Sequence, residues 1–192
     1  MMSEASTVLY FVRHAESRYV EEQERERGLT EQGHQDAGTV ASLLQGEQIQ
    51  LFYSSPYRRA VDTIQILADR SGGIVVTEED LRERQLSSSD VRHDHFREAK
   101  QRLYRDPTYA YSGGESGEQA CSRAIAVIEK ILDKHAGHRV VIGTHGDVMT
   151  LILQHYDTSY GYDFWESSTM PDIYKLEFDG THKLVQVTRL WK

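Results

Sequence analysis

The sequence has one cysteine, no long apolar run and fewer basic than acidic residues. The single cysteine, Cys121, excludes an internal disulfide and favours a reducing compartment, where we expect it to be a small packed side chain. Because there is no apolar run of about twenty residues, and no basic leader at the amino terminus, we expect a cytoplasmic protein that does not enter a membrane. The 22 basic residues against 30 acidic ones give a net charge of -8, which argues against a nucleic-acid partner.

What the sequence does contain is typical of a folded protein, because 192 residues with 39% hydrophobic and 27% charged content can form a core. No internal repeat, low-complexity tract or linker divides the chain, so we expect one domain over residues 1–192. An anionic ligand of this acidic protein would need a local positive pocket. The sequence indicates no particular oligomeric state.

A short apolar run from Val8 to Val12 predicts a buried strand, and Arg13 and His14 follow it directly. Buried parallel strands in α/β proteins present their chemistry at their carboxyl ends. Arginine offers a planar, permanently charged fork for phosphate oxygens, and a neutral histidine can be a nucleophile near pH 7. The pair therefore suggests a site where a phosphoryl group is held and attacked.

The next segments read as a charged loop and two helices. Residues 18–27 are interpreted as solvated, with the alternative that one of three arginines reaches the distal part of an anionic ligand: Arg18, Arg25 or Arg27. Thr30 is the expected N-cap of a helix that packs through a stripe of Ala37, Val40, Ala41 and Leu44 and stops near Gly46.

A second strand, Leu51 to Ser54, is followed by Ser55-Pro56, which predicts a helix with Ser55 as its N-cap. Arg58 and Arg59 lie about 100° apart around that helix, so only one can face a ligand in front of the strand ends. Arg59 shares a side with Thr63. A helix start also supplies unpaired N–H groups and a positive dipole for an anion.

Further along, a strand over residues 74–76 precedes a charged stretch in which Glu83 is a candidate general acid. Residues 90–106 predict a polar helix that ends before Pro107, and the irregular residues up to 114 are a candidate lid. Ser116 and Gln119 match a capping box for a helix that runs to Lys134.

The carboxyl-terminal third repeats the strand-then-histidine pattern. A buried strand over residues 139–143 leads to Thr144, His145 and Gly146 and then to a helix. Two later strands, over 172–178 and 183–191, are joined through Asp179-Gly180, which predicts antiparallel pairing at one edge of an otherwise parallel α/β sheet.

Four motifs occur in order: Arg13-His14, Ser-Pro-x-x-Arg-Ala-x-x-Thr at 55–63, Leu-x-Glu at 81–83, and Thr-His-Gly at 144–146. Together they resemble the histidine phosphatase superfamily, also called phosphoglycerate mutase-like, over nearly the whole chain. The resemblance implies a three-layer α/β/α sandwich with a mostly parallel mixed sheet, and a small phosphorylated substrate. It also implies that no metal or cofactor takes part.

The resemblance further implies His14 as the phosphate acceptor, Glu83 as the proton donor, and a phosphate clamp of Arg13, Arg59 and His145. Thr30 and Gly33 fit the family's Leu-Thr-x-x-Gly stretch, and residues 113–116 fit its Gly-Glu-Ser helix start. Additional candidates for substrate contacts are Ser17, Thr30 and Gly146.

Elementary chemistry supports these roles. Phosphoryl transfer requires positioning and stabilisation of charge on the equatorial oxygens, for which two guanidinium groups and an imidazole are suited. His14 must be neutral at its attacking nitrogen, so we expect a backbone carbonyl to accept a hydrogen bond from its other nitrogen. Glu83 must be protonated when the leaving alkoxide departs.

Two departures favour hydrolysis over mutase chemistry. Val20 stands where mutases of the family carry an asparagine, and the stretch between Glu83 and His145 is too short for a large cap that would exclude water. Ala15 replaces the family's usual glycine. The alternatives left open are a phosphoglycerate-type mutase, a non-catalytic phosphate-binding regulatory module, and a metal site drawing on His93, Asp94, His95, His14, His145 and Asp147.

Overall fold

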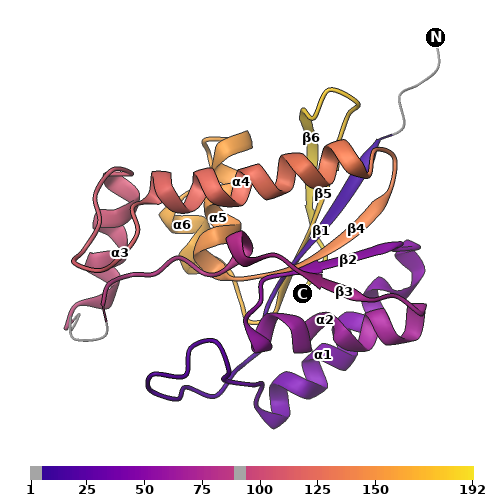
Figure 1. Cartoon of the computed structure of the whole chain (residues 1–192), viewed down its shortest axis with the longest axis horizontal. Coiled ribbons are helices and arrows are strands. Elements are labelled where there is room, and N and C mark those ends of the chain that lie inside the picture. Colours follow the sequence, from indigo (N-terminus) through magenta and orange to yellow (C-terminus); the bar gives the residue numbers. More distant parts are fainter. Residues whose placement is uncertain (1–5, 89–93) are drawn as a thin grey trace.

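The computed structural model describes residues 6–88 and 94–192, and a six-stranded mixed sheet forms its centre (Figure 1). The strand order is β3-β2-β4-β1-β5-β6. Their bounds are Thr7–Arg13 for β1, Leu51–Ser54 for β2, Val75–Thr77 for β3, Arg139–Thr144 for β4, Asp172–Phe178 for β5 and Leu184–Arg189 for β6. β3, β2, β4 and β1 pair in parallel, while β5 pairs antiparallel with β1 and with β6. The expected hairpin at one edge of the sheet is confirmed.

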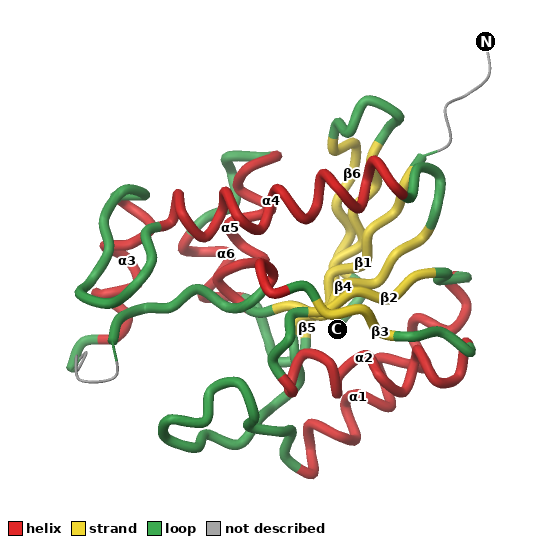
Figure 2. The backbone as a smooth tube through the Cα atoms, viewed as in Figure 1, coloured by secondary structure: helices red, strands yellow, loops and turns green. Residues whose placement is uncertain are grey.

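Helices cover both faces of the sheet and make three layers (Figures 1 and 2). On one face lie α1 (Glu31–Leu44) and α2 (Arg58–Ser71), and on the other α4 (Gly117–Lys134) and α5 (Gly146–Tyr156). Two short helices, α3 (Phe96–Arg105) and α6 (Tyr162–Ser167), pack near the ends of α4 and α5, and 3-10 turns occupy Gln45–Glu47 (η1) and Glu79–Leu81 (η2). In this described part of the chain, no helix combines the length and apolar character needed to cross a bilayer.

Strand β1 lies at the centre of the core, and its side chains are buried on both faces of the sheet. Leu9 and Phe11 join the core beneath α4 and α5, and Val8, Tyr10 and Val12 join the one beneath α1 and α2. A strand covered on both sides needs apolar residues at consecutive positions, which explains the continuous apolar run in the sequence. Each large apolar side chain so buried contributes roughly 1.5–3 kcal/mol.

Side-chain caps fix two helix starts at the predicted residues. The Thr30 hydroxyl accepts the Gly33 N–H at 3.0 Å at the start of α1. At the start of α4, Ser116 and Gln119 form the complete reciprocal capping box. Each cap of this kind stabilises its helix by about 1 kcal/mol.

Other expected boundaries were wrong. Helix α2 begins at Arg58 with Tyr57 as its N-cap, because the Ser55 hydroxyl accepts the Tyr57 N–H at 3.2 Å in a turn before the helix. Strand β3 begins one residue later than expected, at Val75. The polar helix expected over 90–106 is α3, which begins at Phe96, and residues 89–93 lie outside the described part of the chain.

The parallel register brings distant residues to one edge of the sheet. Arg13 at the end of β1 pairs with Thr144 at the end of β4, and Ser54 at the end of β2 pairs with Gly143. The residues that follow these ends are His14, His145 and Ser55. The arrangement matches the general rule that chemistry in such sheets lies outside the carboxyl ends of the strands.

Candidate active site

Backbone hydrogen bonds hold the two histidines side by side. The His14 N–H donates to the Thr144 carbonyl at 3.0 Å, and the Ser55 N–H donates to the Gly143 carbonyl at 2.9 Å. The imidazole rings of His14 and His145 meet edge to face with their centroids 5.3 Å apart. Both residues are buried, with 6% of His14 and 0% of His145 exposed.

The tautomer of His14 follows from its surroundings. Its Nδ1 lies 2.8 Å from the Ala15 carbonyl oxygen, which can only accept, so Nδ1 must carry the proton. The expected backbone carbonyl is thereby confirmed. Burial lowers the pKa of His14 to about 3, and the nearby charges of Arg59 and Arg13 add to this effect. At neutral pH the ring is uncharged, and Nε2 carries a free lone pair.

Ser55 fixes the tautomer of His145 in turn. The Ser55 hydroxyl oxygen accepts the Tyr57 N–H and lies 2.7 Å from His145 Nε2. Since no other acceptor among the described residues contacts this hydroxyl, we assign Ser55 as the donor to Nε2. His145 Nδ1 then carries a proton, and it is buried without a hydrogen-bond partner among the residues the structure describes. Burial lowers the pKa of His145 well below its ordinary value. Ser55, expected only as a helix cap, is therefore a residue of the site.

Arg13 is held by Ser168, which sequence reasoning did not identify as part of the site. Its Nη1 donates to the carbonyl of Ser168 at 3.0 Å and to its hydroxyl at 2.5 Å, just after helix α6. Its guanidinium packs against the backbone of Gly146, where a Cβ would come within 2.9 Å of the guanidinium carbon. Glycine at 146 therefore makes room for Arg13. Within the described residues, the buried Nε of Arg13 has no partner.

Arg58 and Arg59 point in different directions, as their separation of about 100° around the helix predicts. Arg58 is exposed and pairs with Asp62, whereas the Arg59 side chain is 2% exposed. Arg59 Nη1 donates to the Glu24 carbonyl at 2.6 Å and Nη2 to the Glu24 carboxylate at 2.7 Å. Its guanidinium also lies over the ring of Tyr57, 4.9 Å from the centroid, and its buried Nε is unpartnered within the described chain.

Glu83 reaches the start of helix α5, beside His145. Its Oε1 accepts the N–H groups of Arg84 at 2.8 Å and Val148 at 3.0 Å, and its Oε2 accepts the Asp147 N–H at 3.2 Å. Burial raises the pKa of Glu83 above its ordinary value, and the Asp147 charge raises it further, although Lys100 and the N–H groups oppose both. The carboxyl group is thus suited to carry a proton.

A buried ion pair stands behind Glu83. Lys100 of α3 binds the Asp147 carboxylate, with side chains 8% and 1% exposed, and the Tyr104 hydroxyl donates to the same carboxylate at 2.8 Å. The Lys100 ammonium also lies 5.1 Å from the ring centroid of Trp165 on α6. This ion pair was missed because a lysine in a polar helix gives no sequence signal for burial.

The remaining candidates for substrate contacts have structural partners. The Ser17 hydroxyl accepts from Arg27 Nη1 at 2.5 Å, and the Thr30 hydroxyl caps α1 and donates to the Glu16 carboxylate at 2.7 Å. A Cβ at Gly33 would lie 2.1 Å from the Glu16 carbonyl, so only glycine fits there.

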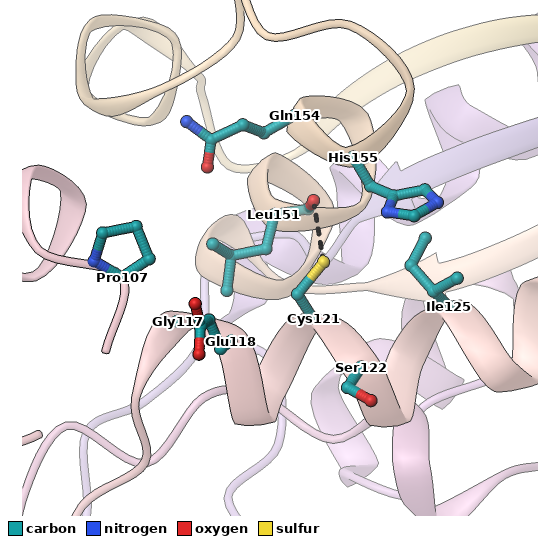
Figure 3. A pocket seen from close by; sticks show the side chains of 9 residues that line it. All are labelled: Pro107, Gly117, Glu118, Cys121, Ser122, Ile125, Leu151, Gln154 and His155. Carbon is teal, nitrogen blue, oxygen red and sulfur yellow. Dashed lines mark hydrogen bonds between the residues drawn. The ribbon is translucent and has the colours of Figure 1, made fainter. Parts of the chain in front are cut away.

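We name His14, His145, Arg13, Arg59 and Glu83 the histidine cluster, since the structure brings all five together at the strand ends. A separate groove of about 410 Å³ between α4 and α5 is lined by Cys121, Ile125, Leu151 and their neighbours, and by no member of the cluster (Figure 3). Among residues 6–88 and 94–192, no group of three or more His, Cys, Asp or Glu could hold a metal ion, and His93 lies outside these ranges.

A model of the histidine phosphatase superfamily (branch 1) matches residues 9–189. The chain belongs to this superfamily. Phosphoglycerate mutase-like protein 4 of Arabidopsis thaliana is 33% identical over 171 residues, which are 83% of this chain and 73% of that protein. The family and the three-layer fold implied by the four sequence motifs are thus confirmed.

Two further similar proteins are named as phosphatases. A metal-independent phosphoserine phosphatase of A. thaliana is 31% identical over 138 residues, which are 66% of this chain and 57% of that protein. A mycobacterial glucosyl-3-phosphoglycerate phosphatase has the same fold, with a TM-score of 0.78 at 21% identity, covering 96% of this chain and 97% of that one.

Proposed function

We propose that this histidine phosphatase family member is a metal-independent hydrolase of a small phosphomonoester, which acts through a phosphohistidine on His14 with Glu83 as proton donor. The observation that carries the proposal is the pairing of His14 Nδ1 with the Ala15 carbonyl at 2.8 Å, which leaves a neutral ring with a free lone pair on Nε2. A neutral imidazole in this state is a competent nucleophile at pH 7.

The groups around His14 suit a phosphoryl group. Five buried nitrogen donors have no hydrogen-bond partner among the described residues. Two are the Nη groups of Arg84, and three belong to the histidine cluster: Nε of Arg13, Nε of Arg59 and Nδ1 of His145. Buried donors are nearly always paired in folded proteins, so this set indicates a ligand with several acceptor oxygens. A phosphate has such oxygens, and two guanidinium groups match its charge.

In the first step, His14 Nε2 attacks phosphorus and the bond to the leaving oxygen breaks, while that oxygen takes the proton of Glu83. Glu83 Oε2 accepts a single N–H, from Asp147 at 3.2 Å, so it has a lone pair left for the proton. The Nδ1–H of His14 remains on the Ala15 carbonyl and stabilises the positive charge that develops on the ring.

In the second step, water attacks the phosphohistidine, the P–N bond breaks, and ionised Glu83 takes the proton from the water. Inorganic phosphate leaves and neutral His14 and protonated Glu83 are restored. The same carboxyl group thus serves as general acid and then as general base, for which a raised pKa is favourable.

A mutase is the second candidate, supported by the similarity to a phosphoglycerate mutase-like protein. Hydrolysis is favoured because Val20, which is 37% exposed, carries no group that can donate to a phosphate. Incubation with 3-phosphoglycerate, following the isomer and inorganic phosphate together, distinguishes the two. Isomer that forms faster than inorganic phosphate would overturn the hydrolase proposal.

The test of catalysis compares wild type with His14→Ala on p-nitrophenyl phosphate, with and without a chelator. We expect turnover by the wild type that the chelator does not change, and none above background from the variant. Equal rates would remove His14 from the mechanism, and absence of turnover on a broad panel of phosphomonoesters would favour a non-catalytic phosphate-binding module.

A further inference from the structure

Residues 18–28 form a loop, which we name the Glu24 loop, between β1 and α1 (Figure 2). The loop is closed at its base, where the Arg18 N–H donates to the Gly28 carbonyl at 3.0 Å and Ser17 pairs with Leu29. Its far part is tied to α2, because the Arg25 carbonyl accepts the Arg58 N–H at 2.9 Å. The loop is therefore held over the start of α2, where Arg59 lies.

One carboxylate in this loop binds two guanidinium groups. Glu24 Oε1 accepts from Arg59 Nη2 at 2.7 Å and from Arg27 Nη2 at 3.1 Å, and its Oε2 accepts from Arg27 Nε at 3.0 Å. Arg27 and Arg59 therefore meet at the same carboxylate oxygen, and the charge of Arg27 contributes to lowering the pKa of both His14 and His145. Glu24 thus pairs with two guanidinium groups beside the proposed nucleophile.

The Glu24 side chain is exposed, whereas the two arginine side chains that it binds are buried or nearly so. The Glu24 side chain is 51% exposed, whereas those of Arg59 and Arg27 are 2% and 15% exposed. The Glu24 carboxylate can therefore turn into water and be hydrated there, but Arg59 cannot follow it. A buried guanidinium left without a counter-charge is strongly unfavourable, so departure of Glu24 requires another anion in its place.

We propose that Glu24 is a specificity-determining residue, an internal ligand of Arg59 that a phosphate dianion displaces, after which Arg27 and Arg59 both bind the phosphate. This inference rests on the proposed function, because it concerns the ligand of the same site. A phosphomonoester dianion brings two charges and three terminal oxygens against the one charge and two oxygens of the carboxylate. A monoanion gains no charge in the exchange, so the site selects dianions.

Displacement can be measured because phosphate binds only to molecules in which Glu24 has left Arg59. The apparent affinity for phosphate is therefore the intrinsic affinity multiplied by the fraction of such molecules. The experiment titrates inorganic phosphate, at an alkaline pH where it is a dianion, into wild type and Glu24→Gln by calorimetry. We expect the variant to bind phosphate roughly tenfold more tightly. Glu21→Gln is the matched control, since it removes the same charge from an exposed side chain of the same loop.

Two further variants keep the test decisive. Glu24→Asp retains the charge but shortens the reach to Arg59, so it is expected to tighten phosphate binding as Glu24→Gln does. The double variant Glu24→Gln/Arg27→Gln is expected to lose the gain, because Arg27 then no longer contributes to the phosphate site. If the double variant still binds phosphate more tightly than wild type, Arg27 does not bind the phosphate and that part of the inference is wrong.

The outcomes separate this inference from the proposed function. If wild type hydrolyses phosphomonoesters but Glu24→Gln binds phosphate no more tightly than wild type or Glu21→Gln, the inference on Glu24 is wrong and the hydrolase proposal stands. If neither wild type nor Glu24→Gln binds phosphate, the inference on Glu24 is wrong, and the hydrolase proposal is decided by the turnover of phosphomonoesters by wild type.

Discussion

The ion pair of Lys100 and Asp147 leads to a testable prediction, because its two charges change the pKa of Glu83 in opposite directions. The charge of Asp147 raises the pKa of Glu83, and the charge of Lys100 lowers it. Since Glu83 must be protonated to donate, activity on an alkyl phosphate falls as pH rises through its pKa in the complex. Lys100→Met should therefore move this alkaline limb to higher pH, and Asp147→Asn should move it to lower pH.

The magnitude follows from charge and burial. At the effective dielectric constant of about 20 that describes such sites, a neighbouring unit charge contributes on the order of 1–3 kcal/mol. Because 1.36 kcal/mol corresponds to about tenfold, each variant should change the rate at a fixed pH on the limb by roughly fivefold to 160-fold. Both partners are almost fully buried, so Lys100→Met should also lower the free energy of unfolding by about 3 kcal/mol.

The assay measures kcat for an alkyl phosphate by phosphate release over about pH 5 to 9, with urea denaturation of each variant alongside. Tyr104→Phe is the control, because it removes a hydrogen bond to Asp147 without changing any charge at pH 7, and its limb should stay in place. Limbs that move in the same direction for Lys100→Met and Asp147→Asn, or that do not move at all, would refute Glu83 as the group that titrates.

Three further predictions concern other parts of the site. Glu83→Gln should slow formation of the phosphohistidine from an alkyl phosphate by about 10²–10⁴-fold and far less from p-nitrophenyl phosphate, whose leaving group departs without a proton; equal losses in this first step, measured in a single turnover, would exclude proton donation. Ser55→Ala frees the tautomer of His145 and should lower kcat/KM roughly tenfold, as loss of one oriented donor does, with Ser55→Thr restoring it; steady-state kinetics on all three proteins decides this. Because the folded pKa of His14 lies below its unfolded value of 6.5, its contribution to stability is complete above pH 6.5 and decreases, by about 1.4 kcal/mol per pH unit, down to pH 3. Urea denaturation at several pH values should show a shallower dependence for His14→Ala, and an identical dependence would contradict a neutral buried His14.

The sequence predicted those parts of the fold that local signals determine. Caps at Thr30 and Ser116, and the apolar runs of β1, β4 and β5, placed most elements within one or two residues. Helix α6 was missed because it has six residues and none of them is buried, so it shows no apolar periodicity. Ser55 was misassigned because Ser-Pro is a common helix start, and its contact with His145 spans ninety residues of sequence.

The members of the histidine cluster were predicted because each lies at or after the end of a strand or in the first turn of a helix, whereas the charged residues around them were not. Glu24 and Lys100 stand in stretches whose composition is typical of solvated surface. Their partners, Arg59 and Asp147, are 35 and 47 residues away, and only the folded chain brings them into contact. Long-range ion pairs of this kind have no local pattern to reveal them.

The most direct test of the central claim is to trap the covalent intermediate. Wild-type protein mixed with a phosphomonoester, quenched in base within the first turnover and examined by peptide mass spectrometry and ³¹P NMR, should carry an acid-labile phosphoryl group on Nε2 of His14. Steady hydrolysis with no phosphoryl group on His14, or with one on another residue, would contradict the account.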